Sequence, residues 1–288
     1  MIKNSSILKK IWIKFLYGNH WMPTILYLTM RYYVEIGEIP NLIKPLNYNE
    51  KINWLKMTDH NDKYFDLVDK YEVKDHVSKK IGSRYVVPTL AIWNDVDDIK
   101  LDILPDKFVL KCTHDSGSVV ICTNKSSFDI EDAKTRLNKS FRQNHYWWGR
   151  EWAYKNVKPR IIAEQYIEDY DGNTIDYKIW CFHGEPKVIE VIYDRFTEYK
   201  YQIFDVNWNK INCVVGKEQD NSRIINKPEC LNKLLELAEK LSCGFAFIRI
   251  DFYIINDKIF FGEMTFYPGS GIEKIEPKEF NIKLGNWI

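Results

Sequence analysis

The sequence of 288 residues lacks an excess of charge of either sign. Its 41 Lys and Arg residues are matched by 40 Asp and Glu residues, which leaves a formal net charge of +1. The charges are mixed along the chain rather than gathered in blocks. Because nucleic-acid-binding proteins usually carry a clear basic excess, the composition does not support a nucleic-acid partner and we expect none.

Cysteine pairs at metal-binding spacing are also missing. The six cysteines form no Cys-x-x-Cys pair and show no zinc-like spacing. No secretory signal is apparent, so we expect reduced, mostly buried thiols in a cytoplasmic protein. The cysteines concerned are Cys112, Cys122, Cys181, Cys213, Cys230 and Cys243.

A long uninterrupted apolar run is absent too. The apolar stretch that begins at Trp21 is broken by Pro23, Arg31 and Glu35, which is too interrupted for a spanning helix. We expect residues 1–45 to form a helical extension with an amphipathic helix. That helix either packs on the rest of the protein or docks on a partner or on the inner face of a membrane.

Internal repeats and low-complexity tracts are not visible, and helical and strand patterns alternate in blocks. Three- and four-residue apolar spacing predicts helices within residues 47–81 that end at Gly82, and further helices at 129–142 and 227–244. Residues 147–159 are expected to be an ordered aromatic loop. This arrangement favours an α+β enzyme. Strands are expected within residues 108–111, 119–122, 160–169, 175–184, 186–195, 201–205, 245–254 and 258–267.

The last two strands carry acids on a shared face. Alternation within residues 245–254 places Arg249 and Asp251 on one side of the strand. If residues 256–258 form a three-residue loop, Asp251 opposes Glu263 and Arg249 opposes Thr265, whereas a two-residue loop would pair Asp251 with Gly262. We therefore predict the three-residue loop. The reverse face would then be wholly apolar, with Ile248, Ile250, Phe252, Ile254, Phe260, Met264 and Phe266.

The proximity of Asp251 and Glu263 requires a compensating charge. Two carboxylates about 4 Å apart repel each other by roughly 4 kcal/mol at an effective dielectric constant of 20. A magnesium ion could offset this repulsion, because it binds one or two protein carboxylates together with water and phosphate oxygens. An ion-pair cluster of Arg249, Asp251 and Glu263 is the alternative interpretation.

A small-residue loop follows the strand that ends near Lys111. Small residues let backbone N–H groups approach phosphate oxygens, and a lysine on the preceding strand can supply a positive charge. The same composition is also typical of an ordinary hairpin turn. The loop consists of Thr113, His114, Asp115, Ser116, Gly117 and Ser118.

The order of these features resembles the ATP-grasp superfamily, and within it the TupA-like family associated with teichuronopeptide and surface-polysaccharide biosynthesis. The likeness covers roughly residues 45–275, and its most specific stretches are KCTHDSGSVVIC, KNVKPRIIAEQYIED and FIRIDFYIINDKIFFGEMTFYPGSG. It implies an α+β ATP-grasp fold that holds a nucleotide between two α+β subdomains. The expected division is an extension at 1–45, a helical substrate-side subdomain at 46–104, a small subdomain with the phosphate loop at 105–168 and a large subdomain with the metal site at 169–288.

The resemblance assigns nucleotide contacts to the first half of this region. Lys111 would contact the α-phosphate, and the loop from Thr113 to Ser118 would cover the β- and γ-phosphates. Either Glu168 or Asp171 would bind the ribose. The adenine would lie against Glu164, Gln165, Tyr166 and Ile167.

The second half would supply the reacting groups. Lys178 would lie near the γ-phosphate, and Arg249 would steady the transferred phosphate. Asp251 and Glu263 match the magnesium ligands, whereas Thr265 stands where the wider superfamily commonly has asparagine. Arg195 would face the acceptor carboxylate on the same analogy, or else form a surface ion pair.

The resemblance implies a ligase that uses ATP and one or two Mg²⁺ ions. Such enzymes phosphorylate a carboxylate and then let an amine or amino acid displace the phosphate, giving an amide and ADP. The expected acceptor is a sugar acid or sugar-linked carboxylate of a bacterial capsule or cell-surface polysaccharide. A glycosyltransferase is the main alternative, although it would leave the small-residue loop after Lys111 and the Glu263-x-Thr265 pair unexplained. A module that only binds nucleotide is a third possibility.

Overall fold

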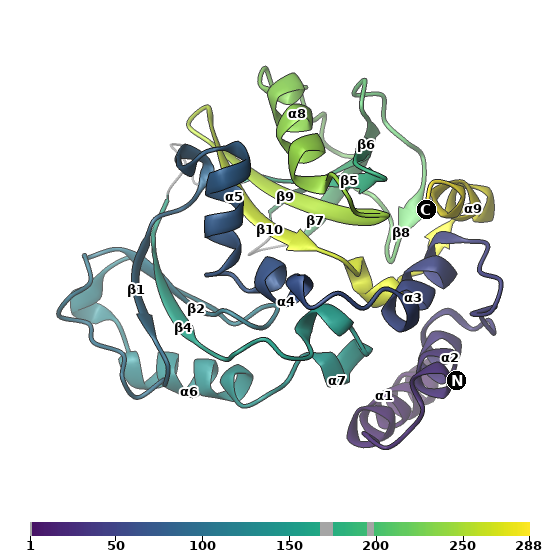
Figure 1. Cartoon of the computed structure of the whole chain (residues 1–288), viewed down its shortest axis with the longest axis horizontal. Coiled ribbons are helices and arrows are strands. Elements are labelled where there is room, and N and C mark those ends of the chain that lie inside the picture. The colour runs from purple at the N-terminus through teal and green to yellow at the C-terminus, as the bar shows by residue number, and fades with distance from the viewer. Residues whose placement is uncertain (1, 168–174, 195–198) are drawn as a thin grey trace.

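The computed structural model describes residues 2–167, 175–194 and 199–288, and within them two antiparallel sheets form the body of the protein (Figure 1). The small sheet has the strand order β1–β4–β2–β3, and the large sheet has the order β10–β9–β5–β6–β7. This arrangement confirms the expected α+β class.

Helices dominate the first 81 residues, as the apolar spacing predicted. The extension forms α1 (Ile2–Gly18) and α2 (Thr24–Ile36). They are followed by α3 (Tyr48–Thr58), α4 (Lys63–Val68) and α5 (Val73–Ile81). Gly82 ends α5 with φ +112° and donates its N–H to the Ser78 carbonyl at 3.0 Å. No helix in the described ranges is both long and apolar enough to cross a membrane.

The small sheet packs one face against α6 (Ile130–Phe141). Phe108, Leu110 and Ala163 are completely buried on that face beneath Leu137. The opposite face carries polar side chains, because alternation sends every second residue away from this core. The strands are β1 (Thr89–Trp93), β2 (Phe108–Cys112), β3 (Val119–Cys122) and β4 (Ile161–Gln165).

The large sheet packs its apolar face against α8 (Leu231–Ser242), which lies on the side away from the small sheet (Figure 1). Ile250 and Phe252 are completely buried on this face together with Leu234. The strands are β5 (Ile175–Phe182), β6 (Glu185–Tyr193), β7 (Lys200–Asp205), β9 (Phe247–Ile255) and β10 (Lys258–Thr265).

Shorter elements connect and flank the sheets. The expected aromatic loop includes most of α7 (Tyr146–Gly149) and a 3-10 turn at Trp152–Tyr154. A further 3-10 turn at Pro268–Gly271 precedes the carboxyl-terminal helix α9 (Lys278–Asn286). A two-stranded ribbon joins β8 (Val214–Val215) to β11 (Ile275–Glu276).

The β9–β10 hairpin corrects one prediction. Its loop has two residues, Asn256 and Asp257, because Ile255 pairs directly with Lys258. Their φ angles of +50° and +62° match a tight turn with a left-handed backbone at both positions. The predicted three-residue loop is therefore wrong.

A β-bulge at Gly262 nevertheless keeps the predicted acid pairing. The register shifts by one residue between Phe261 and Glu263, so Asp251 still opposes Glu263. The extra residue also means that, before the bulge, the side chains of β10 point to the face opposite to the one predicted. Ile259 and Phe261 are buried there, whereas Phe260, predicted for the apolar face, pairs with Tyr253 instead.

All six cysteines are free thiols. Four of them are buried, Cys230 is partly exposed and Cys243 is exposed, in agreement with the expectation of mostly buried thiols. Burial raises the pKa of Cys112 and of Cys181 to about 12, so these thiols stay protonated at neutral pH.

Candidate functional site

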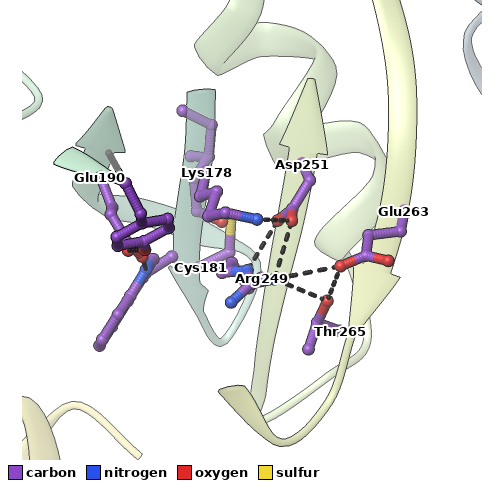
Figure 2. A network of polar contacts seen from close by, with 10 residues as sticks. Lys178, Cys181, Glu190, Arg249, Asp251, Glu263 and Thr265 are labelled. Atoms are coloured by element: carbon purple, nitrogen blue, oxygen red, sulfur yellow. Dashed lines mark hydrogen bonds and ion pairs between the residues drawn. The ribbon is translucent and has the colours of Figure 1, made fainter. Parts of the chain in front are cut away.

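A row of charged side chains crosses the polar face of the large sheet. Lys178 on β5 pairs with Glu190 on β6 on one side and with Asp251 on β9 on the other. Asp251 in turn pairs with Glu263 on β10. The strand registers therefore line up four ionisable residues from four neighbouring strands (Figure 2).

Asp251 is the most enclosed member of this row. Its side chain is only 4% exposed, and it accepts hydrogen bonds from two cations. Lys178 Nζ donates to Oδ2, while Arg249 donates from Nε to Oδ1 at 2.7 Å and from Nη2 to Oδ2 at 2.8 Å. Burial alone lowers the pKa of Arg249, but the Asp251 charge outweighs it and raises that pKa.

Glu263 lies at the more open end of the row. Its side chain is 40% exposed, and Oε1 accepts hydrogen bonds from Arg249 Nη2 and Thr265 Oγ1, both at 3.2 Å. Arg249 Nη2 also donates to Thr265 Oγ1 at 3.1 Å (Figure 2). The ion-pair cluster considered from the sequence is thus present in the structure.

The oxygen atoms of this cluster suit a hard cation. Asp251, Glu263 and Thr265 offer two carboxylates and a hydroxyl, the donor types that magnesium binds when phosphate and water complete its shell. Across residues 2–167, 175–194 and 199–288, no group of three or more His, Cys, Asp or Glu side chains could hold a metal ion. The two carboxylates and the hydroxyl fit an ion whose remaining ligands are phosphate and water oxygens.

A second charged cluster lies on the small sheet. Glu164 is 6% exposed, and its two carboxylate oxygens contact Lys111 Nζ at 2.5 Å and Lys74 Nζ at 2.6 Å. Burial raises the pKa of Glu164, but Lys111 and Lys74 together hold it below its usual value. Lys111 and Glu164 both lie on the sheet face opposite the α6 core.

The predicted phosphate loop turns most of its polar side chains inward. Thr113, His114 and Asp115 are buried, whereas Ser116 and Gly117 are exposed. Ser118 Oγ donates to Asp115 Oδ1 at 2.7 Å and accepts from the Cys112 N–H at 3.0 Å. The parts of the loop that a ligand could reach are therefore its tip and its backbone.

Lys70, which belongs to the amino-terminal helical region, holds this loop in place. Its Nζ donates to the Asp115 carbonyl and lies 3.6 Å from Asp115 Oδ1. Burial lowers the pKa of His114 in the same loop, so its imidazole is neutral at pH 7.

Two cavities lie between the sheets. The smaller, about 50 Å³, is bordered by Lys74, Lys111 and Glu164 from one side and by Tyr253 and Gly262 from the other. The larger measures about 540 Å³, within the range of small-molecule sites. Its lining includes Gln165, Tyr166, Ile167, Ile255, Asn256 and Lys258.

Three of the predicted site residues cannot be placed. Glu168, Asp171 and Arg195 lie outside the described residues. The remaining ones fall into the two charged clusters, the loop at 113–118 and the wall of the larger cavity.

Sequence reasoning missed four charged residues at this site, Lys70, Lys74, Glu190 and Glu273. Glu190 is 7% exposed, and it accepts hydrogen bonds from Trp180 Nε1 at 3.2 Å and Tyr199 OH at 3.4 Å. Burial and then the Glu190 charge raise the pKa of Glu273. Alternation along β6 could have placed Glu190 on the Lys178 face, but no motif signals the two lysines.

Comparisons with known proteins identify relatives of this chain. The model of the family described as TupA-like ATPgrasp matches residues 50–288. No curated protein matches the chain.

Several solved structures match parts of this chain at low sequence identity. A D-alanine–D-alanine ligase from Bacillus anthracis complexed with ATP is 14% identical with a TM-score of 0.38, over 69% of this chain and 53% of that one. The D-alanine–D-alanine ligase from Helicobacter pylori is 14% identical, with a TM-score of 0.42 over 77% and 61%. A RimK domain ATP-grasp protein from Sphaerobacter thermophilus is 11% identical, with a TM-score of 0.41 over 77% and 66%. The chain spans about half the length of the first of these.

Proposed function

We propose that this chain, which belongs to the TupA-like ATP-grasp family, is an ATP- and magnesium-dependent carboxylate–amine ligase. ATP-grasp proteins typically use both cofactors. In the proposed reaction a substrate carboxylate oxygen attacks the γ-phosphorus of ATP, and the bond to the ADP oxygen breaks. An amine nitrogen then attacks the acyl carbon, phosphate leaves with the bonding electrons, and the nitrogen releases a proton as the amide forms.

The observation that carries this proposal is the charged row on the large sheet. Lys178 and Arg249 place two cations beside Asp251 and Glu263 on one polar face. Phosphoryl transfer depends on positioning and on neutralising charge more than on a protein nucleophile. Lys178 and Arg249 would neutralise the transferred phosphate and orient it in line with the acceptor carboxylate.

Asp251, Glu263 and Thr265 would hold magnesium, which when bound neutralises further charge on the nucleotide phosphates. Glu263 suits the role of a metal ligand because its side chain is 40% exposed. Asp251 is already compensated by Lys178 and Arg249, so it would share its oxygens between these cations and the metal.

The nucleotide would lie between the two sheets. The cavity of about 540 Å³ beside Gln165, Tyr166 and Ile167 suits the base. Lys111 and Lys74 border the adjoining smaller cavity and would meet the α- and β-phosphates once Glu164 gives up one of its two partners. The exposed tip of the loop at Ser116 and Gly117 would cover the γ-phosphate through backbone N–H groups.

The substrate assignment rests on the likeness to the TupA-like family. We propose a sugar acid or sugar-linked carboxylate of a bacterial surface polysaccharide as the acceptor, with an amino acid or small amine as the second substrate. Arg195 is proposed to pair with the acceptor carboxylate, because its planar fork suits bidentate contact.

Release of ADP and phosphate tests the reaction class. Incubation with ATP, magnesium and pairs of sugar acids and amines is expected to release both products in equal amounts. Glu263→Gln should reduce this turnover by at least a hundredfold without unfolding the protein, whereas the exposed Glu236→Gln on α8 should leave it unchanged. Turnover of a sugar nucleotide without ATP would instead identify a glycosyltransferase.

A binding measurement separates failure of the substrate assignment from failure of the nucleotide assignment. ATP with magnesium at 100 times its Kd should add about 2.7 kcal/mol to the free energy of unfolding. Stabilisation by ATP without turnover would leave nucleotide binding intact and reject the substrates tried. No stabilisation at millimolar ATP and magnesium would reject the proposal itself.

A further inference from the structure

The amino-terminal extension concentrates the exposed apolar surface of the protein. Of eighteen large apolar side chains that are exposed within the described residues, ten lie between Ile11 and Leu46. Among them, Trp21 is 78% exposed and Ile43 is 80% exposed. Such a concentration in one short segment marks a contact surface, because isolated exposed apolar residues are normally scattered.

These side chains form stripes on their helices. Ile11, Trp12 and Phe15 lie on one side of α1, because positions 12 and 15 come one and four residues after position 11. Ile25 and Leu26 lie together on the first turns of α2. Trp21 lies in the connection between the helices, and Tyr33 lies on α2. The remaining exposed members follow α2 and are Ile39, Ile43 and Leu46.

The extension is anchored to the rest of the protein on its other side. Leu16 and Tyr27 are completely buried, and Tyr27 OH donates to the Trp148 carbonyl at 2.7 Å. Arg150 Nη2 donates to the Asn19 carbonyl at 3.0 Å. Figure 1 shows the α1–α2 pair at one edge of the molecule, away from both sheets. The exposed stripes therefore belong to a fixed surface.

The extension also has a charge of its own. Residues 1–45 contain six basic and two acidic residues, which gives +4, so the other 243 residues carry −3. Glu35 pairs with Lys9 and Arg31, at 2.7 Å and 3.0 Å respectively, and Glu38 pairs with Lys278. Both acids are thus compensated.

Three exposed lysines on the extension are left uncompensated. Lys10, Lys14 and Lys44 make no ion pair with any residue in the described ranges. Lys10 and Lys14 flank the apolar stripe of α1, and Lys44 follows Ile43. Apolar side chains are thus interspersed with free positive charge.

We propose that residues 9–46 dock the protein on the surface of an anionic lipid bilayer. Aromatic and aliphatic side chains of α1, α2 and the following loop would enter the boundary between headgroups and acyl chains, while Lys10, Lys14 and Lys44 contact anionic headgroups. Tryptophan suits this depth, because its ring is apolar and its N–H can stay hydrated.

The distribution of charge favours a bilayer over a protein partner. Charged residues, lysine in particular, are depleted at the core of protein interfaces, whereas here free lysines are interspersed with the apolar side chains. The family model begins at residue 50, so the extension lies outside the region that the family shares. Docking would then be an added function of this segment, independent of the proposed ligase activity.

Co-sedimentation with vesicles tests the proposal on the full chain. Binding to vesicles with about a third anionic lipid is expected to exceed binding to neutral phosphatidylcholine vesicles at least tenfold. It should weaken as salt rises, because the Debye length shortens from about 10 Å at 0.1 M to about 3 Å at 1 M. Equal or absent binding to both kinds of vesicle would overturn the proposal.

Matched variants separate the two contributions. The triple variant Lys10→Gln, Lys14→Gln and Lys44→Gln is expected to lower partitioning to anionic vesicles roughly a hundredfold, from about 1 kcal/mol per lysine. Trp12→Ser with Phe15→Ser and Trp21→Ser should abolish binding. The controls are Lys63→Gln, Lys80→Gln and Lys100→Gln for charge, and Ile103→Ser with Ile224→Ser for apolar exposure, all on exposed side chains outside the extension.

Sedimentation velocity tests the competing occupant. The apolar face could instead join two copies of the chain. In that case the wild type will be a dimer, the variant with Ser at positions 12, 15 and 21 will be a monomer, and neither will bind vesicles. That result would overturn the proposal. Unchanged far-UV circular dichroism of each variant shows that any loss of binding does not arise from unfolding.

Discussion

Lys178 and Asp251 face each other directly across β5 and β9, and the ammonium group of Lys178 donates a hydrogen bond to Asp251 Oδ2. Arg249 binds the same carboxylate through two further hydrogen bonds. A buried carboxylate in such surroundings is stabilised only while its cationic partners are present, and each cation depends equally on the carboxylate.

Asp251→Asn should strongly destabilise the protein. The substitution leaves Lys178 and Arg249 close together without their shared anion, which is expected to lower the free energy of unfolding by about 3–5 kcal/mol. Urea unfolding at pH 7 measures the change. The exposed Glu236→Gln is the control, with an expected effect within about 0.5 kcal/mol. A loss below 1 kcal/mol for Asp251→Asn would show that the ion-pair cluster contributes little.

Glu164→Gln should reveal how much the ion pairs of Glu164 with Lys111 and Lys74 stabilise the protein. These lysines hold the pKa of Glu164 below its usual value of 4.5, so the charged carboxylate stabilises the fold above that pH. This contribution is lost as pH falls through the lowered pKa of the folded state. Wild type should exceed the variant by about 3 kcal/mol at pH 7 in urea unfolding, and the difference should shrink below pH 4. A difference that stays constant from pH 7 to pH 3 would contradict this.

Lys56 gives a pH dependence of the same sign at alkaline pH, but there the neutral form of the side chain is the one that the fold favours. It is 2% exposed on α3, and its Nζ donates to the carbonyl of Ser270 at 2.8 Å and to its hydroxyl at 3.0 Å. Burial lowers the pKa of Lys56 from 10.5 to about 8. Between these values the unfolded chain holds more protons than the folded one, so stability rises with pH.

Lys56→Met should remove this alkaline gain. Wild type is expected to gain about 2 kcal/mol relative to the variant between pH 7.5 and pH 9.5, measured as the difference between their free energies of unfolding. Taking the difference cancels the titration of other groups, such as buried tyrosines. An equal response of both proteins to pH would mean that Lys56 keeps its proton in the folded state throughout.

Asp257→Gly should stabilise the β9–β10 hairpin. Asp257 has φ +62°, a left-handed conformation that glycine adopts without the strain of a side chain. The expected gain is about 1 kcal/mol in the free energy of unfolding, read from the thermal and urea midpoints. Asp257→Ala keeps a β-carbon and serves as the matched control, for which no gain is expected. A gain of equal size with alanine would refute the turn geometry.

Local patterns in the sequence were sufficient to predict the main elements and the polar residues on one face of the β9–β10 hairpin. Three- and four-residue spacing located α3, α5, α6 and α8, and alternation located the strands of both sheets except β1, because these periods are local properties of the backbone. The pairs Asp251–Glu263 and Arg249–Thr265 also followed from the sequence. Their registers proved correct although the loop length did not, since the bulge at Gly262 offsets the shorter turn.

Contacts between residues from distant segments became apparent only in the folded structure. The order β10–β9–β5–β6 places Glu190, Lys178, Asp251 and Glu263 in one row. The packing of α5 beside the small sheet brings Lys74 to Glu164. Strand order and bulges depend on the packing of the whole core, and one extra residue moves each following side chain to the opposite face. No local pattern in the sequence contains that information.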